Sequence, residues 1–196
     1  MEIRSAVLAD AAEACAVLRR SILELCFPDH GNDQALLARW LSNKTPEKVA
    51  SWIAQPDHSL LVAVEDDAIL AVGGVTDTGE ITLNYVSPDA RFRGVSKILV
   101  RALEIRAAER GNVQCTLAST ETARRFYLSA GYSETGPPVI LFGMHTPSPD
   151  GPPRAAVQFR PGSTGGASWG QAGNASWAHG AAERAHMESP AARRKS

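Results

Sequence analysis

The stretch from residue 80 to residue 111 places the strongest constraint on how this chain folds. Residues 80–86 alternate apolar and polar side chains, which is the period-two pattern of a strand with one buried face. From residue 95 to about residue 110 apolar side chains recur at helical spacing, and Gly111 supplies a stop signal. The sequence therefore predicts a strand, a short loop and a helix in direct succession.

The loop has the chemistry of an anion-binding site. The first amides of an α-helix lack intrahelical partners and carry partial positive charge, so a helix that begins at Val95 can bind a phosphate. Gly94 lets the backbone approach a ligand closely or adopt a positive φ. Positive charge comes from Arg91, Arg93 and Lys97, although the two arginines are also compatible with plain surface charge. The glycine spacing is neither that of a nucleotide P-loop nor that of a dinucleotide fingerprint.

The segment Arg91-x-x-Gly94-x-Ser96 resembles the acetyl-CoA pyrophosphate loop of the GNAT N-acetyltransferase superfamily, whose pattern is Gln/Arg-x-x-Gly-x-Gly/Ala. Ser96 stands where the family has Gly or Ala. Serine is small, so close approach of a phosphate is still expected.

A second segment is similar to the same family. Thr120-Glu-Thr-Ala-Arg-Arg-Phe-Tyr127, followed by Gly131-Tyr132, matches the element Asn-x-x-Ala-x-x-Phe-Tyr and a later Gly-Phe/Tyr. Thr120 is a suitable N-cap and Gly131 a suitable helix stop, so a helix is expected between them. The departure is Thr120 in place of the family's Asn. The two matches occur in the family's order, and the resemblance spans roughly residues 2–142.

The order of the remaining periodic segments agrees with that resemblance. They are, in chain order, a strand at residues 3–4, a helix at 10–25, shorter helices at 36–41 and 45–55, strands at 60–65 and 69–76, and a strand at 113–118. Asp10 and Glu13 have the spacing of a capping box, and Asp66-Asp67 that of a hairpin turn. The expected fold is α/β, a GNAT-like acyl-CoA N-acyltransferase fold with a mixed, mainly antiparallel sheet flanked by helices.

The composition changes near residue 145. We expect residues 1–144 to form the GNAT N-acetyltransferase domain, and residues 145–196, rich in Pro, Gly, Ala and Ser, to be a disordered tail. The family ordinarily closes its sheet with a last strand. Two segments are candidates for it here, residues 139–143 and residues 155–160.

Composition also excludes some classes of protein. The chain has 196 residues, 44% of them hydrophobic, which suits one domain with a sizeable core. A net charge of −1 argues against bulk binding of nucleic acid, and no segment has the length and apolarity of a membrane span or signal peptide. Three isolated cysteines fit a reducing compartment, so a cytoplasmic location is expected. Cys26 and His30 lack a second ligand pair, so no metal site is expected.

The resemblance implies acetyl-CoA as co-substrate and assigns its contacts. Tyr85 and Val86 are expected to bind the pantetheine arm through backbone hydrogen bonds, with the Val86 amide polarising the thioester carbonyl. Thr120 is expected to contact the same arm. The pyrophosphate is expected to contact the loop and the first turn of the helix, which comprise Arg91, Phe92, Arg93, Gly94, Val95, Ser96 and Lys97.

The resemblance also assigns the catalytic groups. Tyr127 aligns with the family's usual tyrosine and is expected to stabilise or protonate the departing thiolate; core packing is its alternative role. Glu80 is the best-placed carboxylate for deprotonating the amine, directly or through water, and solvation is its alternative. Asp29 and His30 lie where the family often shapes its acceptor pocket, but a solvated or capping role is favoured for both.

The predicted function is N-acetyl transfer from acetyl-CoA to a primary amine by direct transfer. The acceptor is a small molecule or a peptide, and the sequence does not distinguish between these two classes. Dimerisation is common in the family, so a homodimer is a further expected partner. The alternative is a non-catalytic acyl-CoA-binding or regulatory module of the same fold.

Overall fold

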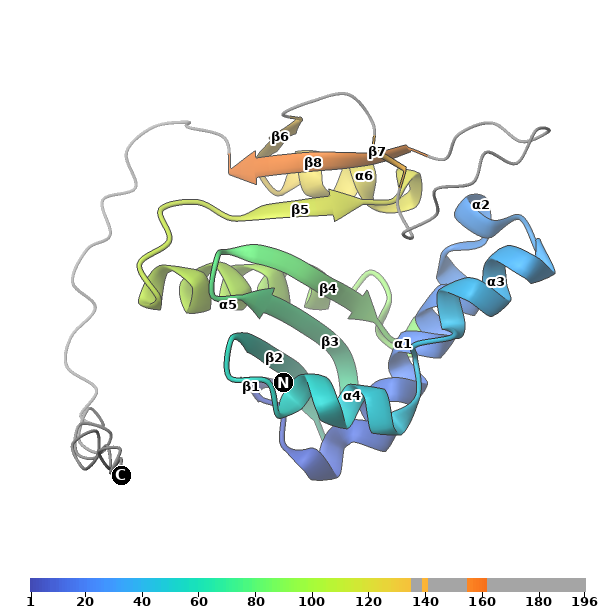
Figure 1. Cartoon of the computed structure of the whole chain (residues 1–196), viewed down its shortest axis with the longest axis horizontal. Helices are drawn as coiled ribbons and strands as arrows, with labels where there is room; N and C mark the ends of the chain where they lie inside the picture. Colours follow the sequence, from blue (N-terminus) through green and yellow to red (C-terminus); the bar gives the residue numbers. More distant parts are fainter. Residues whose placement is uncertain (135–138, 141–154, 162–196) are drawn as a thin grey trace, which may run out of the picture. The chain divides into compact units, whose positions relative to one another are not determined.

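The computed structural model describes residues 1–134, 139–140 and 155–161 (Figure 1). The strands within these residues form a sheet in the order β1-β2-β3-β4-β5-β8-β6, with β7 paired to β8. Their bounds are β1 Glu2–Ser5, β2 His58–Glu65, β3 Ala68–Thr76, β4 Glu80–Val86, β5 Thr116–Ser119, β6 Tyr132–Glu134, β7 Val139–Ile140 and β8 Ala155–Pro161. Every pair is antiparallel except β4 with β5, which is parallel. The mixed, mainly antiparallel sheet is therefore confirmed.

Helices cover both faces of this sheet. Their bounds are α1 Ala11–Leu25, α2 Phe27–His30, α3 Gln34–Leu41, α4 Pro46–Ile53, α5 Val95–Glu109 and α6 Glu121–Ser129, with 3-10 turns η1 Leu8–Asp10 and η2 Pro88–Ala90. Along β2, Leu60 and Val62 pack with α1 and α4, whereas Leu61 packs in a second core cluster with α5 and α6. Figure 1 shows α4 and α5 on opposite faces. Burying each such side chain contributes about 1.5–3 kcal/mol, so the alternation along the strands fixes the layers.

The expected hairpin turn between β2 and β3 is confirmed. Asp66 and Asp67 both adopt positive φ, 50° and 63°. Two successive residues of that kind form a turn whose twist matches the flanking strands, and Asp tolerates this conformation better than most residues.

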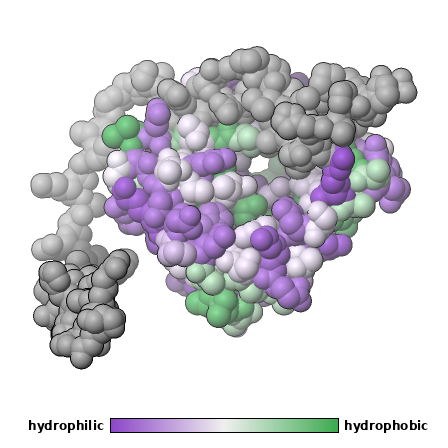
Figure 2. Space-filling view, viewed as in Figure 1, coloured by the Kyte–Doolittle hydropathy of each residue, from purple (hydrophilic) through white to green (hydrophobic). Residues whose placement is uncertain are grey.

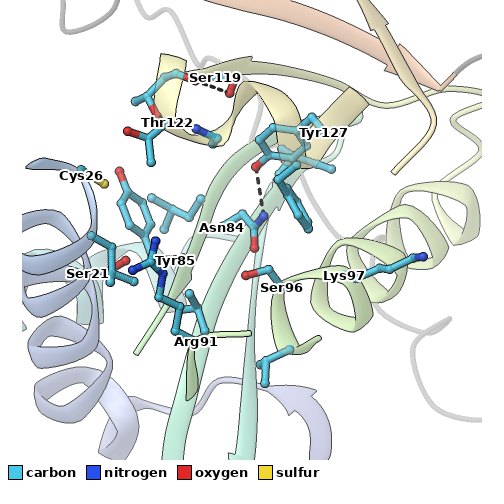
Figure 3. A pocket seen from close by; sticks show the side chains of 18 of the residues that line it. Ser21, Cys26, Asn84, Tyr85, Arg91, Ser96, Lys97, Ser119, Thr122 and Tyr127 are labelled. Atoms are coloured by element: carbon cyan, nitrogen blue, oxygen red, sulfur yellow. Dashed lines mark hydrogen bonds between the residues drawn. The ribbon is translucent and has the colours of Figure 1, made fainter. Parts of the chain in front are cut away.

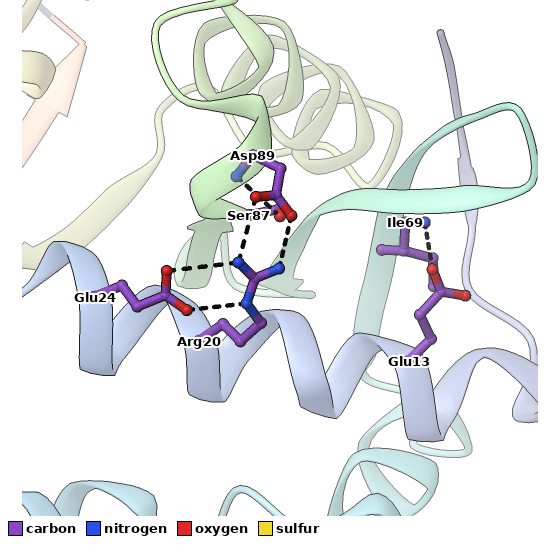
Figure 4. Close-up of polar contacts among 6 residues, drawn as sticks. All are labelled: Glu13, Arg20, Glu24, Ile69, Ser87 and Asp89. Atoms are coloured by element: carbon purple, nitrogen blue, oxygen red, sulfur yellow. Dashed lines mark hydrogen bonds and ion pairs between the residues drawn. The ribbon is translucent and has the colours of Figure 1, made fainter.

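The capping box expected at Asp10 and Glu13 does not form. The Asp10 carboxylate instead accepts hydrogen bonds from the Arg4 guanidinium at 2.6 and 2.9 Å and from the Val7 amide at 2.7 Å. The Glu13 carboxylate accepts the Ile69 amide of β3 at 2.7 Å (Figure 4). Both carboxylates therefore bind groups on the sheet instead of capping the helix. These hydrogen bonds join the N-terminal part of α1 to the sheet.

The strand expected at residues 113–118 is shifted. β5 begins at Thr116 and ends at Ser119, and Val113 is almost fully exposed. The apolar run that suggested an earlier start therefore includes part of the loop after α5.

The last strand of the sheet is β8. It pairs with β5, where Leu117 lies opposite Phe159, and with β6, where Tyr132 lies opposite Pro161. It coincides with the second candidate segment and lies within the part of the chain assigned to the tail. Residues 141–144 and 162–196 lie outside the described residues, so the predicted boundary and the disorder of the tail stay predictions.

The face drawn in Figure 2 is mostly hydrophilic, with apolar residues in small separate groups. No helix within the described ranges combines the length and the apolar character needed to cross a bilayer.

Candidate functional site

The site begins where β4 and β5 separate. The two strands pair only at Glu80 with Thr116 and at Ile81 with Leu117, whereas β4 continues to Val86 beside β3 alone. The backbone of residues 82–86 therefore has one edge without a strand partner in the described part of the chain. A cavity of about 360 Å³ lies along this edge (Figure 3).

A bulge in β4 accounts for the separation. Leu83 lies opposite Gly74 and Ile81 lies opposite Val75, so Thr82 is an extra residue on β4. A bulge bends its strand and increases the local twist. The bend starts at the last pair between β4 and β5, so the bulge turns β4 away from β5.

One end of the cavity is the N-terminus of α5. Gly94 is the N-cap with φ 78°, and its carbonyl accepts the amides of Lys97 and Ile98 at 3.1 and 3.2 Å. The amides of Val95 and Ser96 have no partner among the described residues, and no described side chain caps this end. The first turn contains Lys97 and no acid. Unpaired amides, the helix dipole and a cation together favour an anion here.

The loop before α5 is held by α1. Arg20 on α1 forms an ion pair at 2.7 Å with Asp89 of η2 and a second with Glu24 at 2.9 Å (Figure 4). The Ser87 hydroxyl also accepts the Asp89 amide at 3.4 Å. These contacts place η2, and with it the anion end of the cavity, against α1.

The basic side chains predicted for this end are not equivalent. Arg91 lines the cavity (Figure 3), and its guanidinium carbon lies 4.4 Å from the centre of the exposed Phe92 ring. Lys97 lines the cavity, but its side chain extends away from it. Arg93 is not among the lining residues; its guanidinium forms an ion pair with Glu65, which lowers the pKa of that carboxyl.

Tyr127 lies at the middle of the cavity. Its ring is buried in the core with Phe126 and Tyr132, at centroid distances of 5.0 and 5.7 Å. Its hydroxyl accepts a hydrogen bond of 3.0 Å from Asn84 Nδ2, which joins α6 to β4 (Figure 3). Burial raises the pKa of Tyr127 to about 12, against the opposing effect of the Asn84 hydrogen bond. The side chain therefore both packs in the core and presents a protonated hydroxyl.

Thr120, predicted to contact the cofactor, lines the cavity and is the N-cap of α6. Its hydroxyl accepts the Ala123 amide at 3.4 Å. The cap that the sequence predicted is thus present, and it places the N-terminus of α6 at the cavity wall.

The far end of the cavity lies between α1, α3, β4 and α6. Trp40 donates a hydrogen bond of 3.3 Å to the hydroxyl of Tyr85, and Cys26 and Thr122 line the same end. Burial raises the pKa of Tyr85 above its usual range and that of Cys26 to about 12. Both groups are therefore protonated near neutral pH.

Glu80 is not brought to this cavity. It is the exposed first residue of β4, whereas Tyr85 and Val86 at the other end of the strand line the cavity. Six residue steps separate Glu80 from Val86, about 20 Å in an extended strand. Its role as a base stays a prediction.

Three polar groups that the structure buries or brings to the cavity were not predicted from the sequence. The alternating pattern places Asn84 on the polar face of a strand, but its side chain reaches Tyr127. Asp29 and His30 were expected to be solvated or to cap a helix, yet they are 7% and 1% exposed in the one-turn helix α2. The pattern Cys-Phe-Pro-Asp-His gave no local signal of this burial, because α2 is covered by α6 from far along the chain. No group of three or more His, Cys, Asp or Glu within the described ranges is arranged to bind a metal ion.

A comparison with family models matches residues 26–145 to the acetyltransferase (GNAT) domain. A search of curated proteins by sequence found no match. Solved structures give the fold. A GCN5-related N-acetyltransferase from Rhodopseudomonas palustris superposes with a TM-score of 0.69 at 23% identity, covering 82% of this chain and 94% of that one. For the PaiA N-acetyltransferase from Thermoplasma acidophilum, solved in complex with coenzyme A, the TM-score is 0.62 at 16% identity, with 80% and 96% covered.

A third similar structure is an aminoglycoside 6′-N-acetyltransferase complexed with coenzyme A, with a TM-score of 0.58, 18% identity and coverage of 82% of this chain and 96% of that one. The family match spans more than half of the chain, and these structures share its sheet and helices. The chain belongs to the GNAT acetyltransferase family.

Proposed function

We propose that this protein is an N-acetyltransferase that moves an acetyl group directly from acetyl-CoA to a primary amine. One observation carries the proposal: a single cavity joins the uncapped N-terminus of α5 to the hydroxyl of Tyr127, along the unpaired edge of β4.

The pyrophosphate and the pantetheine arm of coenzyme A suit two different parts of this cavity. Its pyrophosphate fits the amides of Val95 and Ser96, with Arg91 adding charge. Its pantetheine arm is an extended chain with two amide groups. Such a chain can add beside a strand edge as a peptide does, and residues 82–86 offer that edge. The complexes of two similar acetyltransferases with coenzyme A support this assignment.

The chemistry needs three events at the thioester carbon. The amine nitrogen attacks and forms the C–N bond, the carbonyl oxygen takes up negative charge, and the C–S bond breaks. The amide of Val86, at the end of β4 in the cavity wall, is the proposed donor to that oxygen. The hydroxyl of Tyr127 donates a hydrogen bond to the departing thiolate and stabilises or protonates it, and a proton from water restores the hydroxyl if the proton is transferred.

The Tyr127 hydroxyl is protonated near neutral pH, because burial raises its pKa to about 12. A phenol with a raised pKa is a weaker acid, so its main contribution is a hydrogen bond to the sulfur as negative charge develops there. Its oxygen accepts from Asn84, so the O–H bond is directed away from Asn84. The amine loses its own proton to water, or to Glu80 through water as the sequence predicted.

Direct transfer is favoured over an acetyl-cysteine intermediate. Cys26 lines the cavity, but burial, with a smaller effect of Asp29, raises its pKa to about 12. The thiolate is the nucleophilic form, and it is scarce at neutral pH when the pKa is that high.

The first test is the melting temperature of the full chain with and without saturating acetyl-CoA, with ATP as control. At 100 times the dissociation constant, binding adds about 2.7 kcal/mol, which is several degrees for a domain of this size. A panel of primary amines then tests for release of coenzyme A. A shift with acetyl-CoA and coenzyme A release with an amine support the proposal. Binding without release by any amine would favour the non-catalytic module, and no shift would reject the cofactor itself.

A further inference from the structure

We propose that the acceptor is an amine with an apolar body, an alkyl or aryl chain that carries no second charged group. The inference rests on the proposed function, and it deepens that function by naming the class of acceptor. It comes from the residues that line the far end of the cavity.

The far end is the part of the cavity that the proposed position of coenzyme A leaves open. The pyrophosphate lies at the N-terminus of α5, and the pantetheine arm follows the backbone of residues 82–86 toward Tyr127. The rest of the wall comes from α1 and α3, which supply Ser21, Leu25 and Trp40. The amine must reach the thioester carbon from a side that the cofactor does not occupy, so its body lies against these two helices.

The wall at this end is largely apolar. Cys26 and Tyr85 pack against the hydrophobic cluster that contains Trp40, and Leu25 lines the cavity next to Cys26 in the chain. Figure 3 shows Cys26 and Tyr85 on the side of the cavity opposite Lys97. An acceptor that enters here exchanges water for apolar contacts, which favours an alkyl or aryl chain.

The polar groups of this wall carry no charge. Trp40 Nε1 donates a hydrogen bond of 3.3 Å to the hydroxyl of Tyr85. Burial raises the pKa of Tyr85 above its usual range and that of Cys26 to about 12, so both groups stay protonated near neutral pH. Surroundings of this kind also favour the neutral form of a bound amine, which is the form that attacks.

No aspartate, glutamate or histidine of the described residues lines the cavity, and its two charged lining residues, Arg91 and Lys97, are cations. Asp29 binds the amide of the lining residue Thr122, but it does not itself line the cavity, and its Oδ2 atom is buried. A second cation on the acceptor would therefore lose water without gaining an anion. The phosphates of coenzyme A offset the two cations, so a carboxylate on the acceptor would gain no free partner either.

The test compares three acceptors that share a 4-aminobutyl group and differ only in what it carries. They are 1-aminopentane with a methyl end, 1,4-diaminobutane with an ammonium end and 5-aminopentanoate with a carboxylate end. Release of coenzyme A is measured at saturating acetyl-CoA. The value of kcat/KM is expressed per concentration of unprotonated amine, which removes differences between the pKa values of the amines.

We expect kcat/KM of the wild type to be highest for 1-aminopentane, at least about 10-fold above the values for the other two acceptors. The methyl end keeps the apolar contacts, whereas either charged end is desolvated without a partner.

The variant is Leu25→Ala, which removes apolar contact from the far end. Its control is Leu23→Ala, the same change on the same helix, at a side chain that is 45% exposed and does not line the cavity. In Leu25→Ala, kcat/KM for 1-aminopentane should fall about 10-fold, mainly through KM, and the value for 1,4-diaminobutane should fall less. Leu23→Ala should match the wild type, and both variants should keep the acetyl-CoA melting shift.

Several results would overturn the inference while the proposed function stands. These are a wild-type preference for the ammonium or the carboxylate end, acetylation of other amines but not of 1-aminopentane, and an equal loss for all three acceptors in Leu25→Ala. If Leu25→Ala does not fold, the wild-type ranking of the three acceptors decides alone. An absent melting shift with acetyl-CoA, or no release of coenzyme A with any primary amine, is a different failure, since it rejects the proposed function itself.

Discussion

Asn84 Nδ2 donates a hydrogen bond of 3.0 Å to the hydroxyl oxygen of Tyr127, and this contact bridges β4 and α6 at the point where β4 has left β5. The Asn84 Oδ1 atom is buried and has no hydrogen-bond partner in the described part of the chain. The pair thus orients a protonated phenol and leaves an acceptor beside it.

Replacing Tyr127 by Phe should reduce kcat while leaving the affinity for acetyl-CoA unchanged. The ring packing with Phe126 and Tyr132 is kept, and the variant loses the hydroxyl as a proton donor and as the acceptor for Asn84 Nδ2. General acids contribute about 10²- to 10⁴-fold, so a fall of at least about 100-fold is expected. Steady-state kinetics give kcat, and the acetyl-CoA melting shift gives the affinity. A matched control is Tyr132→Phe, which removes a hydroxyl that donates to Glu104 outside the cavity. Equal losses in both variants would mean that the Tyr127 hydroxyl serves the fold and not the reaction.

The parts of the fold that the sequence predicted are those with local signals. The turn at Asp66-Asp67 and the start of α5 after Gly94 need only the residues at those positions, because positive φ and helix capping are properties of a few consecutive residues. The family motif likewise placed Tyr127 and Thr120 at the cavity, since each lies at a fixed position within one helix.

The parts that were missed depend on contacts between distant segments. Asp29 is buried because α2 meets the N-terminus of α6, 93 residues later in the chain. Asp10 and Glu13, which were expected to form a capping box, instead bind Arg4 and the Ile69 amide. Periodicity along one element carries no information on such contacts.

Replacing Gly94 by Glu should weaken acetyl-CoA binding strongly. The new carboxylate would lie at the N-cap of α5, where it competes with the pyrophosphate for the amides of Val95 and Ser96. The control is Gly111→Glu. Gly111 has a similar φ, 85° against 78°, and a Cβ at either position meets nothing within 4 Å. Both variants thus carry the same backbone strain, about 1–2 kcal/mol. Dissociation constants from calorimetry should rise about 100-fold or more in the first variant only. Equal affinities would place the pyrophosphate elsewhere.

Replacing Asp10 by Asn should remove part of the pH dependence of stability on the acid side. The Arg4 hydrogen bond lowers the pKa of Asp10 below its usual value in the folded state. A lowered pKa contributes stability above the unfolded pKa of about 3.8, and this stability is lost as pH falls through the folded value. Because Arg4 is partly exposed, we expect a loss of about 1 kcal/mol at pH 7 in Asp10→Asn. Urea unfolding at a series of pH values should show the wild type and variant converging as the pH falls below 3.8 and through the lower folded-state pKa. A constant difference across the whole range would mean that the lost stability is not electrostatic.

Replacing Glu13 by Ala should destabilise the fold through a backbone group rather than through an ion pair. The carboxylate accepts the Ile69 amide at 2.7 Å, next to the bulge where Val64 lies opposite Ile69 and Ala63 opposite Ala71 (Figure 4). Leaving that amide unpaired costs about 1–3 kcal/mol. The control on the same helix is Glu24→Ala, which loses only an exposed pair with Arg20 and should change the free energy of unfolding little. Hydrogen exchange of the Ile69 amide, read beside the urea unfolding curves, should accelerate in the first variant alone. Equal stability of the two variants would show that a neighbouring group or water replaces the Glu13 carboxylate.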